Sequence, residues 1–379
     1  MSDMQTRFET LAVHGGEPRP GADGSVVFPI YQGTVFEADP GDAAADAPYI
    51  RLGTNPTQRH LQHRLAALEG AEAAVATASG MAAITAALHS VLGVGDHLIA
   101  AGAFYGGTLQ FLTEHAARLG WTFEIVDPDD EGAWRRALRP GTKAFLTETI
   151  TNPTIRIGDL AGAARFAREH ALTSIIDNTL ATPVVFRPHT VGFDLVCHSA
   201  TKALNGHSDL AAGVVTGSST RIAHVASVLC AYGSTLDPHA AFLLSRGLKT
   251  LALRVRQQNA NALAVAEFLA AHDRIADVRY PGLAAHPDHR RAAEWFDGFG
   301  SVLTFRPVGG NEAAELLIKS LQLPYAASSL GGVESLVTRP AAGGHPGPIP
   351  GMSADVIRFS AGIEAAEDLV DDFAQALGA

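Results

Sequence analysis

The chain has 379 residues, of which 47% are apolar and 18% charged, and its formal net charge at pH 7 is −11. This composition is typical of a folded globular protein and excludes a disordered or collagen-like chain. Because lysine and arginine form no run, nucleic-acid binding is not indicated, and neither the histidines nor Cys197 and Cys230 show a metal-site spacing. The polar first ten residues and the lack of a long apolar run lead us to expect a cytoplasmic protein with no membrane segment.

Residues 1–55 are predicted to form an extended arm. They lack helical periodicity and carry several prolines, which interrupt both helices and strand ladders. The stretch from Val26 to Phe36 is too apolar to be simply disordered. We therefore expect the arm to pack against another surface, such as a neighbouring subunit.

Strand and helix patterns alternate through residues 56–245. Leu61, Leu65 and Leu68 repeat at helical spacing. Further helices are predicted at 81–92, 108–119 and 160–170, and strands at 73–77, 97–100, 123–126, 142–146, 173–176, 195–197 and 213–216. This alternation predicts an α/β domain with a large, mostly parallel sheet that binds ligands beyond the carboxyl ends of its strands.

Residues 246–379 have fewer strand patterns and more helical ones. A long helix is predicted at 248–272 and shorter ones at 313–321 and 365–377, with strands at 301–305 and 356–359. This part of the chain is predicted to form a smaller C-terminal α+β domain.

A lysine follows the apolar strand predicted at 195–197, in the segment Ser199-Ala200-Thr201-Lys202. Lysines are rarely buried without a partner, so this position indicates covalent chemistry, with an ordinary surface lysine as the alternative. A desolvated lysine loses its proton more readily and can condense with an aldehyde. The hydroxyls of Ser199 and Thr201 could hold a phosphate beside it.

Two further positions fit the same chemistry. Asp177 ends the strand predicted at 173–176, where a carboxylate could keep a pyridine nitrogen protonated, as pyridoxal 5′-phosphate (PLP) requires. A turn or helix-capping aspartate is the alternative. Ser79-Gly80-Met81 lies between a predicted strand and a helix, where free N–H groups favour a phosphate; an ordinary capped glycine turn is the alternative.

Short motifs occur in one order along nearly the whole chain: Tyr49-Ile50-Arg51-Leu52-Gly53-Thr54-Asn55-Pro56-Thr57, Ser79-Gly80-Met81, Tyr105-Gly106-Gly107-Thr108, Asn152-Pro153, Asp177-Asn178-Thr179, Ser199-Ala200-Thr201-Lys202, Asn205-Gly206-His207, Ser329-Leu330-Gly331-Gly332-Val333-Glu334-Ser335 and Ile357-Arg358. In this order they resemble the Cys/Met-metabolism (trans-sulfuration) PLP-dependent enzymes. The resemblance implies PLP fold-type I, similar in architecture to aspartate aminotransferase.

The resemblance also implies roles for individual residues. Lys202 would bind the cofactor and move protons, Asp177 would hold the pyridine nitrogen, and Tyr105 would stack on the ring. The cofactor phosphate would be held by Gly80, Met81, Ser199 and Thr201. The phosphate in the neighbouring subunit would be contacted by Tyr49 and Arg51. The substrate would be contacted by Asn152, Ser329 and Arg358. A site shared in this way implies an obligate homodimer, and we expect a homotetramer.

Several positions depart from common patterns of the family. Ala203 follows the lysine where many members have an aromatic residue, and Gly107 stands where methionine γ-lyases have a cysteine. Ser328 stands where animal-type cystathionine γ-lyases have a glutamate, and Pro48 where an acidic residue is frequent. These changes concern the substrate side and leave the implied cofactor residues in place.

We therefore expect γ-elimination from L-cystathionine or a related γ-substituted, sulfur-containing amino acid. Close alternatives are γ-replacement of the cystathionine γ-synthase or O-acyl-homoserine sulfhydrylase type, and β-elimination. A distant alternative is a nicotinamide-dependent Rossmann dehydrogenase. That class requires a GxGxxG motif, which Gly93-x-Gly95 does not complete.

Overall fold

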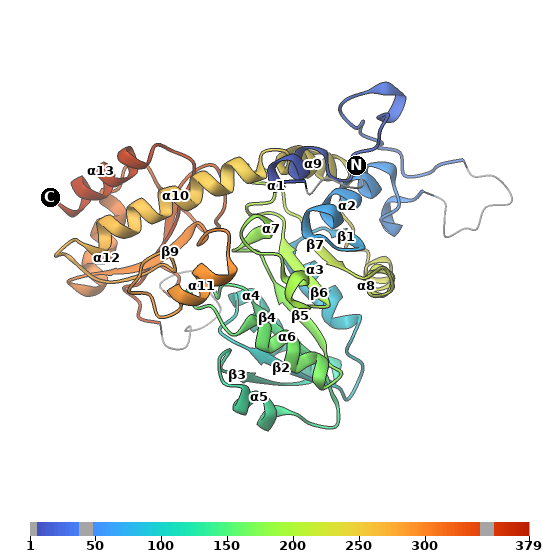
Figure 1. The fold of residues 1–379 in the computed structure, drawn as a ribbon, viewed down its shortest axis with the longest axis horizontal. Coiled ribbons are helices and arrows are strands. Elements are labelled where there is room, and N and C mark those ends of the chain that lie inside the picture. Colours follow the sequence, from blue (N-terminus) through green and yellow to red (C-terminus); the bar gives the residue numbers. More distant parts are fainter. Residues whose placement is uncertain (1–5, 38–47, 342–351, 379) are drawn as a thin grey trace.

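Two β-sheets, each with helices packed against it, organise the chain (Figure 1). The computed structural model describes residues 6–37, 48–341 and 352–378. The larger sheet has seven strands in the order β1-β7-β6-β5-β4-β2-β3, and the smaller has five in the order β10-β11-β12-β9-β8. The prediction of a large sheet followed by a smaller α+β region is confirmed.

The larger sheet is mostly parallel, as predicted. Its strands are β1 (Ala73–Thr77), β2 (His97–Ala101), β3 (Thr122–Val126), β4 (Thr142–Glu148), β5 (Thr173–Asp177), β6 (Leu195–Ser199) and β7 (Gly213–Gly217). Strand β7 runs antiparallel to β1 and β6, whereas β3, β2, β4, β5 and β6 pair in parallel. The carboxyl ends of β4, β5 and β6 therefore meet at one edge.

Helices cover both faces of this sheet because its strands bury both of their faces. In β2, Leu98 packs into one apolar cluster with Ile84, while the next residue, Ile99, packs into another with Leu61 and Phe166. The helices of this region are α2 (Pro56–Glu69), α3 (Gly80–His89), α4 (Gly106–Gln110), α5 (Glu131–Ala137), α6 (Leu160–Glu169), α7 (Thr182–Val185), α8 (Ser219–Tyr232) and α9 (Pro238–Leu248). Helices α3 and α8 belong to the first cluster, and α2, α5 and α6 to the second.

The smaller sheet has a separate apolar core, which includes Leu303, Phe359 and Phe373. Its strands are β8 (Ile275–Arg279), β9 (Val302–Pro307), β10 (Tyr325–Ala326), β11 (Leu336–Thr338) and β12 (Ile357–Ser360), and its helices are α10 (Leu251–Ala270), α11 (His289–Trp295), α12 (Gly310–Ser320) and α13 (Ala366–Leu377). Three of these strands were not predicted from the sequence. Strands β10 and β11 are too short to show a period, and most of the residues of β8 are only half-buried.

Of two longer predicted helices, one is continuous in the structure and the other is interrupted. The helix predicted at 248–272 is confirmed as α10, and tight i→i−3 bonds at Lys249 and Thr250 separate it from α9, which was not predicted. The helix predicted at 108–119 passes from α4 into a π-helical turn at Phe111–His115 and a 3₁₀ turn at Ala116–Leu119. Helical periodicity does not reveal such changes in hydrogen-bond spacing.

The predicted extended arm contains a helix, so that prediction was wrong for its first part. Helix α1 (Phe8–His14) packs against α2 and α10 and buries Ala12. Seven residues give too few turns for a clear helical period. Residues 38–47 of the arm lie outside the described residues.

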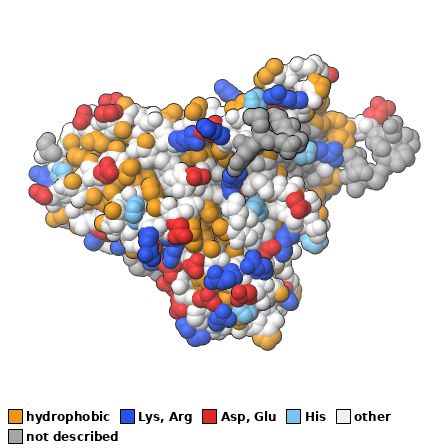
Figure 2. All heavy atoms as spheres, viewed as in Figure 1, with side chains coloured by type: hydrophobic (Ala, Val, Ile, Leu, Met, Phe, Trp, Pro, Cys, Tyr) orange, Lys and Arg blue, Asp and Glu red, His pale blue; other side chains and the backbone are white. Residues whose placement is uncertain are grey.

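Part of the rest of the described arm projects from the body (Figure 1) and exposes apolar side chains, whereas Glu17 and Phe28 contact α2. Val26 is 90% exposed and Val35 is 78% exposed. On the face shown in Figure 2, acidic and basic side chains are interspersed. Among the described residues, no helix combines the length and the apolar character that a membrane crossing needs.

Candidate active site

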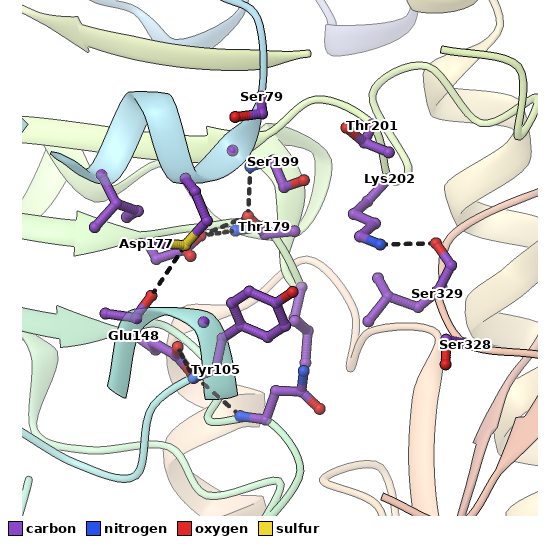
Figure 3. A pocket seen from close by; sticks show the side chains of 18 of the residues that line it. Ser79, Tyr105, Glu148, Asp177, Thr179, Ser199, Thr201, Lys202, Ser328 and Ser329 are labelled. Atoms are coloured by element: carbon purple, nitrogen blue, oxygen red, sulfur yellow. Dashed lines mark hydrogen bonds between the residues drawn. The ribbon is translucent and has the colours of Figure 1, made fainter. Parts of the chain in front are cut away.

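A cavity of about 530 Å³ lies beyond the carboxyl ends of β4, β5 and β6 and the first residues of α3, next to residues of the smaller sheet region (Figure 3). Ten of the twelve site residues predicted from the sequence line it. They are Gly80, Met81, Tyr105, Asn152, Asp177, Ser199, Thr201, Lys202, Ser329 and Arg358. The structure therefore joins residues that lie far apart in the chain, as expected from the carboxyl ends of neighbouring parallel strands.

Lys202 reaches into this cavity from the turn that follows β6. Its Nζ donates a hydrogen bond to Ser329 Oγ at 2.7 Å (Figure 3). Burial, and then the positive charge of Arg358, lower the pKa of Lys202 below its usual range. A larger fraction of this amine is therefore neutral at a given pH, as nucleophilic attack on an aldehyde requires.

Asp177 lies at the end of β5, and Thr179 holds its carboxylate. The backbone N–H of Thr179 donates to Asp177 Oδ1 at 3.0 Å and the Thr179 hydroxyl donates to the same oxygen at 2.5 Å. Burial raises the pKa of Asp177, whereas the bonds from Thr179 and the charge of His198 oppose that increase. The same Thr179 hydroxyl accepts a hydrogen bond from Ser199 N–H at 2.8 Å, which ties Asp177 to the strand that precedes Lys202.

The start of α3 forms a wall of the cavity that suits an anion. Ser79 caps the helix by accepting a hydrogen bond from Ala82 N–H at 3.1 Å. Gly80 packs so closely on β6 that a Cβ atom there would lie 2.6 Å from Ser199 Cβ. Only glycine leaves this approach open, and a helix start with free N–H groups attracts a phosphate.

Thr201 lies beside this wall, but its hydroxyl is already engaged. It donates to the Ala212 carbonyl at 3.1 Å and accepts from Ala212 N–H at 2.9 Å. A hydroxyl oxygen has one proton to donate, so Thr201 can reach a phosphate by its side chain only if this donation changes.

Arg358 lies on β12 at the other side of the cavity. Its side chain is buried, and its Nη1 and Nη2 donate to Asn152 Oδ1 at 3.1 Å and to the Ser329 carbonyl at 2.9 Å. Burial lowers the pKa of Arg358 to about 10. Ser329, which also contacts Lys202, has a φ of +108°, a strained backbone angle for a residue other than glycine.

Tyr105 directly precedes α4 as its N-cap residue, and its ring lies in the cavity (Figure 3). The ring is partly open to solvent, with 44% of the residue exposed. A Cβ atom at Gly107 would lie 2.7 Å from Tyr105 Cε1 and 3.2 Å from Met81 Sδ. In this arrangement the ring occupies the space that a cysteine at position 107 would need.

Two cavity-lining residues with polar side chains, Glu148 and Thr179, were not predicted from the sequence to be site residues. Glu148 ends β4 and is buried beside Asp177. A signal was present, because Glu148 follows an apolar run just as Asp177 does.

Tyr49 and Arg51 do not line the cavity in this chain. Arg51 Nη1 donates to the Cys230 carbonyl at 3.1 Å, and its guanidinium lies 5.7 Å from the centroid of the Tyr49 ring. Both residues are exposed. A role for them at a neighbouring subunit's site remains a prediction.

The cavity fits PLP. Its volume of about 530 Å³ lies in the range of small-molecule sites. The anion-binding wall at Gly80 and the carboxylate of Asp177 both border it, as does the amine of Lys202. These are the three groups needed for the phosphate, the ring nitrogen and the aldehyde.

Comparisons with known proteins agree with this geometry. The family model described as Cys/Met metabolism PLP-dependent enzyme matches residues 9–378. The chain is 38% identical to an L-methionine γ-lyase of Pseudomonas putida over 98% of this chain and 97% of that protein, and 38% identical to a cystathionine γ-lyase of Bacillus subtilis over 97% and 98%. A solved cystathionine γ-synthase of Xanthomonas oryzae pv. oryzae, in complex with aminoacrylate and cysteine, superimposes with a TM-score of 0.94 at 36% identity and covers 99% of this chain and 98% of its own. The chain therefore belongs to the Cys/Met metabolism PLP-dependent enzymes of fold-type I and is a PLP-dependent carbon–sulfur lyase or transferase that acts on small amino acids.

Proposed function

We propose that this enzyme catalyses γ-elimination on L-cystathionine or a related γ-substituted, sulfur-containing amino acid. The supporting observation is the contact between Lys202 Nζ and Ser329 Oγ at 2.7 Å, since the Ser329 carbonyl also accepts a hydrogen bond from Arg358. One amine thus lies between the groups suited to the cofactor and the arginine suited to the α-carboxylate. This is the place from which a base can reach hydrogens on adjacent substrate carbons.

The bound cofactor supplies an electron sink that stabilises negative charge on the substrate Cα. Lys202 takes and returns protons at Cα and Cβ, helped by burial that favours its neutral form. Arg358 holds the substrate carboxylate through its planar pair of N–H groups, with Asn152 fixing the guanidinium. Asp177 keeps the ring nitrogen protonated, and Tyr105 covers the ring.

Gamma-replacement and β-elimination use the same residues. Replacement has one specific support, the TM-score of 0.94 with a cystathionine γ-synthase, although the chain is also similar to γ-lyases and β-lyases. The departures at Gly107 and Ser328 both lie on the lining of the cavity. We propose γ-elimination as the main reaction, and one product analysis distinguishes it from the other two reactions.

We also propose that the working form is a homodimer with shared sites, assembled as a homotetramer in the cytoplasm. The exposed apolar side chains of the arm, such as Val26 and Val35, support burial against another copy. Tyr49 and Arg51 would then reach the neighbouring phosphate. The proposed division is an arm at 1–55, a PLP-binding domain at 56–245 and a C-terminal domain at 246–379.

Product analysis on L-cystathionine tests the reaction. Gamma-elimination releases cysteine, 2-oxobutanoate and ammonia, whereas β-elimination releases homocysteine, pyruvate and ammonia. Release of pyruvate, or turnover of an activated homoserine only when a thiol is present, would contradict the proposal. The Lys202→Ala variant is the control, since it must form none of these products.

A further inference from the structure

A buried acidic side chain joins two loops of the active site. Glu148, at the end of β4, is 5% exposed. Its Oε1 accepts a hydrogen bond from Tyr105 N–H at 2.6 Å, and its Oε2 accepts one from Asn152 N–H at 3.1 Å. One planar carboxyl group therefore connects the loop after β2 with the loop after β4.

Each of these loops carries a side chain that faces the cofactor or the substrate. The ring of Tyr105 lies in the cavity close to Glu148 (Figure 3). Asn152 Oδ1 accepts the hydrogen bond from Arg358 Nη1 at 3.1 Å, so it orients the guanidinium. A displacement of Glu148 would move both the ring and the carboxylate-binding arginine.

We infer that Glu148 is a positioning residue, which fixes the Tyr105 ring relative to the Asn152–Arg358 pair. Glu148 acts through two backbone N–H groups. Because the buried strand β4 lies inside the larger sheet, Glu148 fixes the distance between the Tyr105 ring and the arginine that binds the carboxylate. The inference rests on the PLP chemistry of the family and is independent of which bond is cleaved.

The surroundings of Glu148 match this role. Glu148 and Asp177 are register partners on neighbouring parallel strands. Burial, and then the negative charge of Asp177, raise the pKa of Glu148 well above its usual range. The two N–H groups that Glu148 accepts from oppose that increase, because each stabilises the charged carboxylate.

The test compares two variants of Glu148 with a matched control. The control is Asp372→Asn, because Asp372 is 6% exposed and also holds two backbone N–H groups, those of Gln322 at 3.0 Å and Leu323 at 2.9 Å. It lies on α13, among residues that do not line the cavity. An effect shared by both sites would reflect the loss of a buried backbone contact and nothing specific to the active site.

The probe is L-norleucine, which has an α-amino group and an α-carboxylate but no leaving group. Its dissociation constant is measured on each holoenzyme through the cofactor absorbance, and the circular dichroism of the cofactor band reports ring orientation. In Glu148→Gln the amide oxygen replaces one acceptor and the amide NH₂ opposes the other N–H, so we expect the dissociation constant to rise about tenfold. In Glu148→Ala both loops are released, and we expect a rise of about a hundredfold with a changed dichroic band.

Asp372→Asn is expected to lower the melting temperature and leave both readouts unchanged. The inference is overturned if both Glu148 variants bind L-norleucine like the unmodified enzyme, or if Asp372→Asn weakens binding equally. Should Glu148→Ala fail to fold, the tenfold effect of Glu148→Gln decides the question alone. Because L-norleucine undergoes no cleavage, this outcome is separate from the product analysis on L-cystathionine.

Discussion

Replacing Arg358 separates its contribution to substrate binding from its contribution to stability. The side chain is 7% exposed, and its two described hydrogen bonds go to neutral oxygens of Asn152 and Ser329. In the free enzyme this buried cation therefore has no carboxylate among its described hydrogen-bond partners. The incoming α-carboxylate provides one, and its binding should depend strongly on the guanidinium.

The expected sizes follow from this geometry. Arg358→Ala removes one partner of a buried charge pair, which costs about 2–5 kcal/mol and raises KM about 30- to 5,000-fold. Arg358→Lys keeps the charge but loses the planar fork, so we expect a loss of about 1.5–3 kcal/mol and a rise of about 10- to 150-fold. In both variants Lys202 and Asp177 should still hold the cofactor, and its absorbance should persist.

Stability should change in a different way from binding. Burial lowers the pKa of Arg358 to about 10, and this decrease corresponds to a cost of about 3 kcal/mol for keeping the cation buried. Arg358→Met removes this cost together with two hydrogen bonds of about 1 kcal/mol each. We therefore expect a melting temperature, measured by calorimetry, that equals or exceeds that of the unmodified enzyme. A KM that stays unchanged in Arg358→Ala, or a large loss of stability in Arg358→Met, would refute this reasoning.

Three further predictions concern the cofactor site and its proposed sharing between subunits. Sodium borohydride should fix PLP on the peptide that contains Lys202, and label on another lysine would contradict the assignment. Because attack requires the neutral amine and burial lowers its pKa, the rate of PLP uptake by the apoenzyme should rise with pH to a midpoint below 10.5, the usual value for lysine; a midpoint at or above that value would exclude activation by burial. Arg51→Ala and Lys202→Ala should each be inactive as homodimers but should regain activity when mixed, since a shared site leaves one intact copy in each mixed dimer. If folded, dimeric variants recover nothing on mixing, Arg51 does not serve a neighbouring site.

The sequence alone located the cofactor side of the active site, because local patterns specify it. Asp177 and Lys202 each follow a short apolar run, and Gly80 lies between a strand and a helix. Strand–helix alternation implies parallel strands whose carboxyl ends share one edge, so these residues could be expected to converge. The structure brings all three to one cavity.

The tertiary structure alone decided which distant groups touch. The contact between Lys202 and Ser329 spans the two sheet regions, and Glu148 lies beside Asp177 only because of the register between β4 and β5. Helix α9 and the short strands β10 and β11 were also not predicted from the sequence. Local periodicity records which residues are buried and in what kind of element. It does not record register or packing between elements, and these determine where two distant side chains meet.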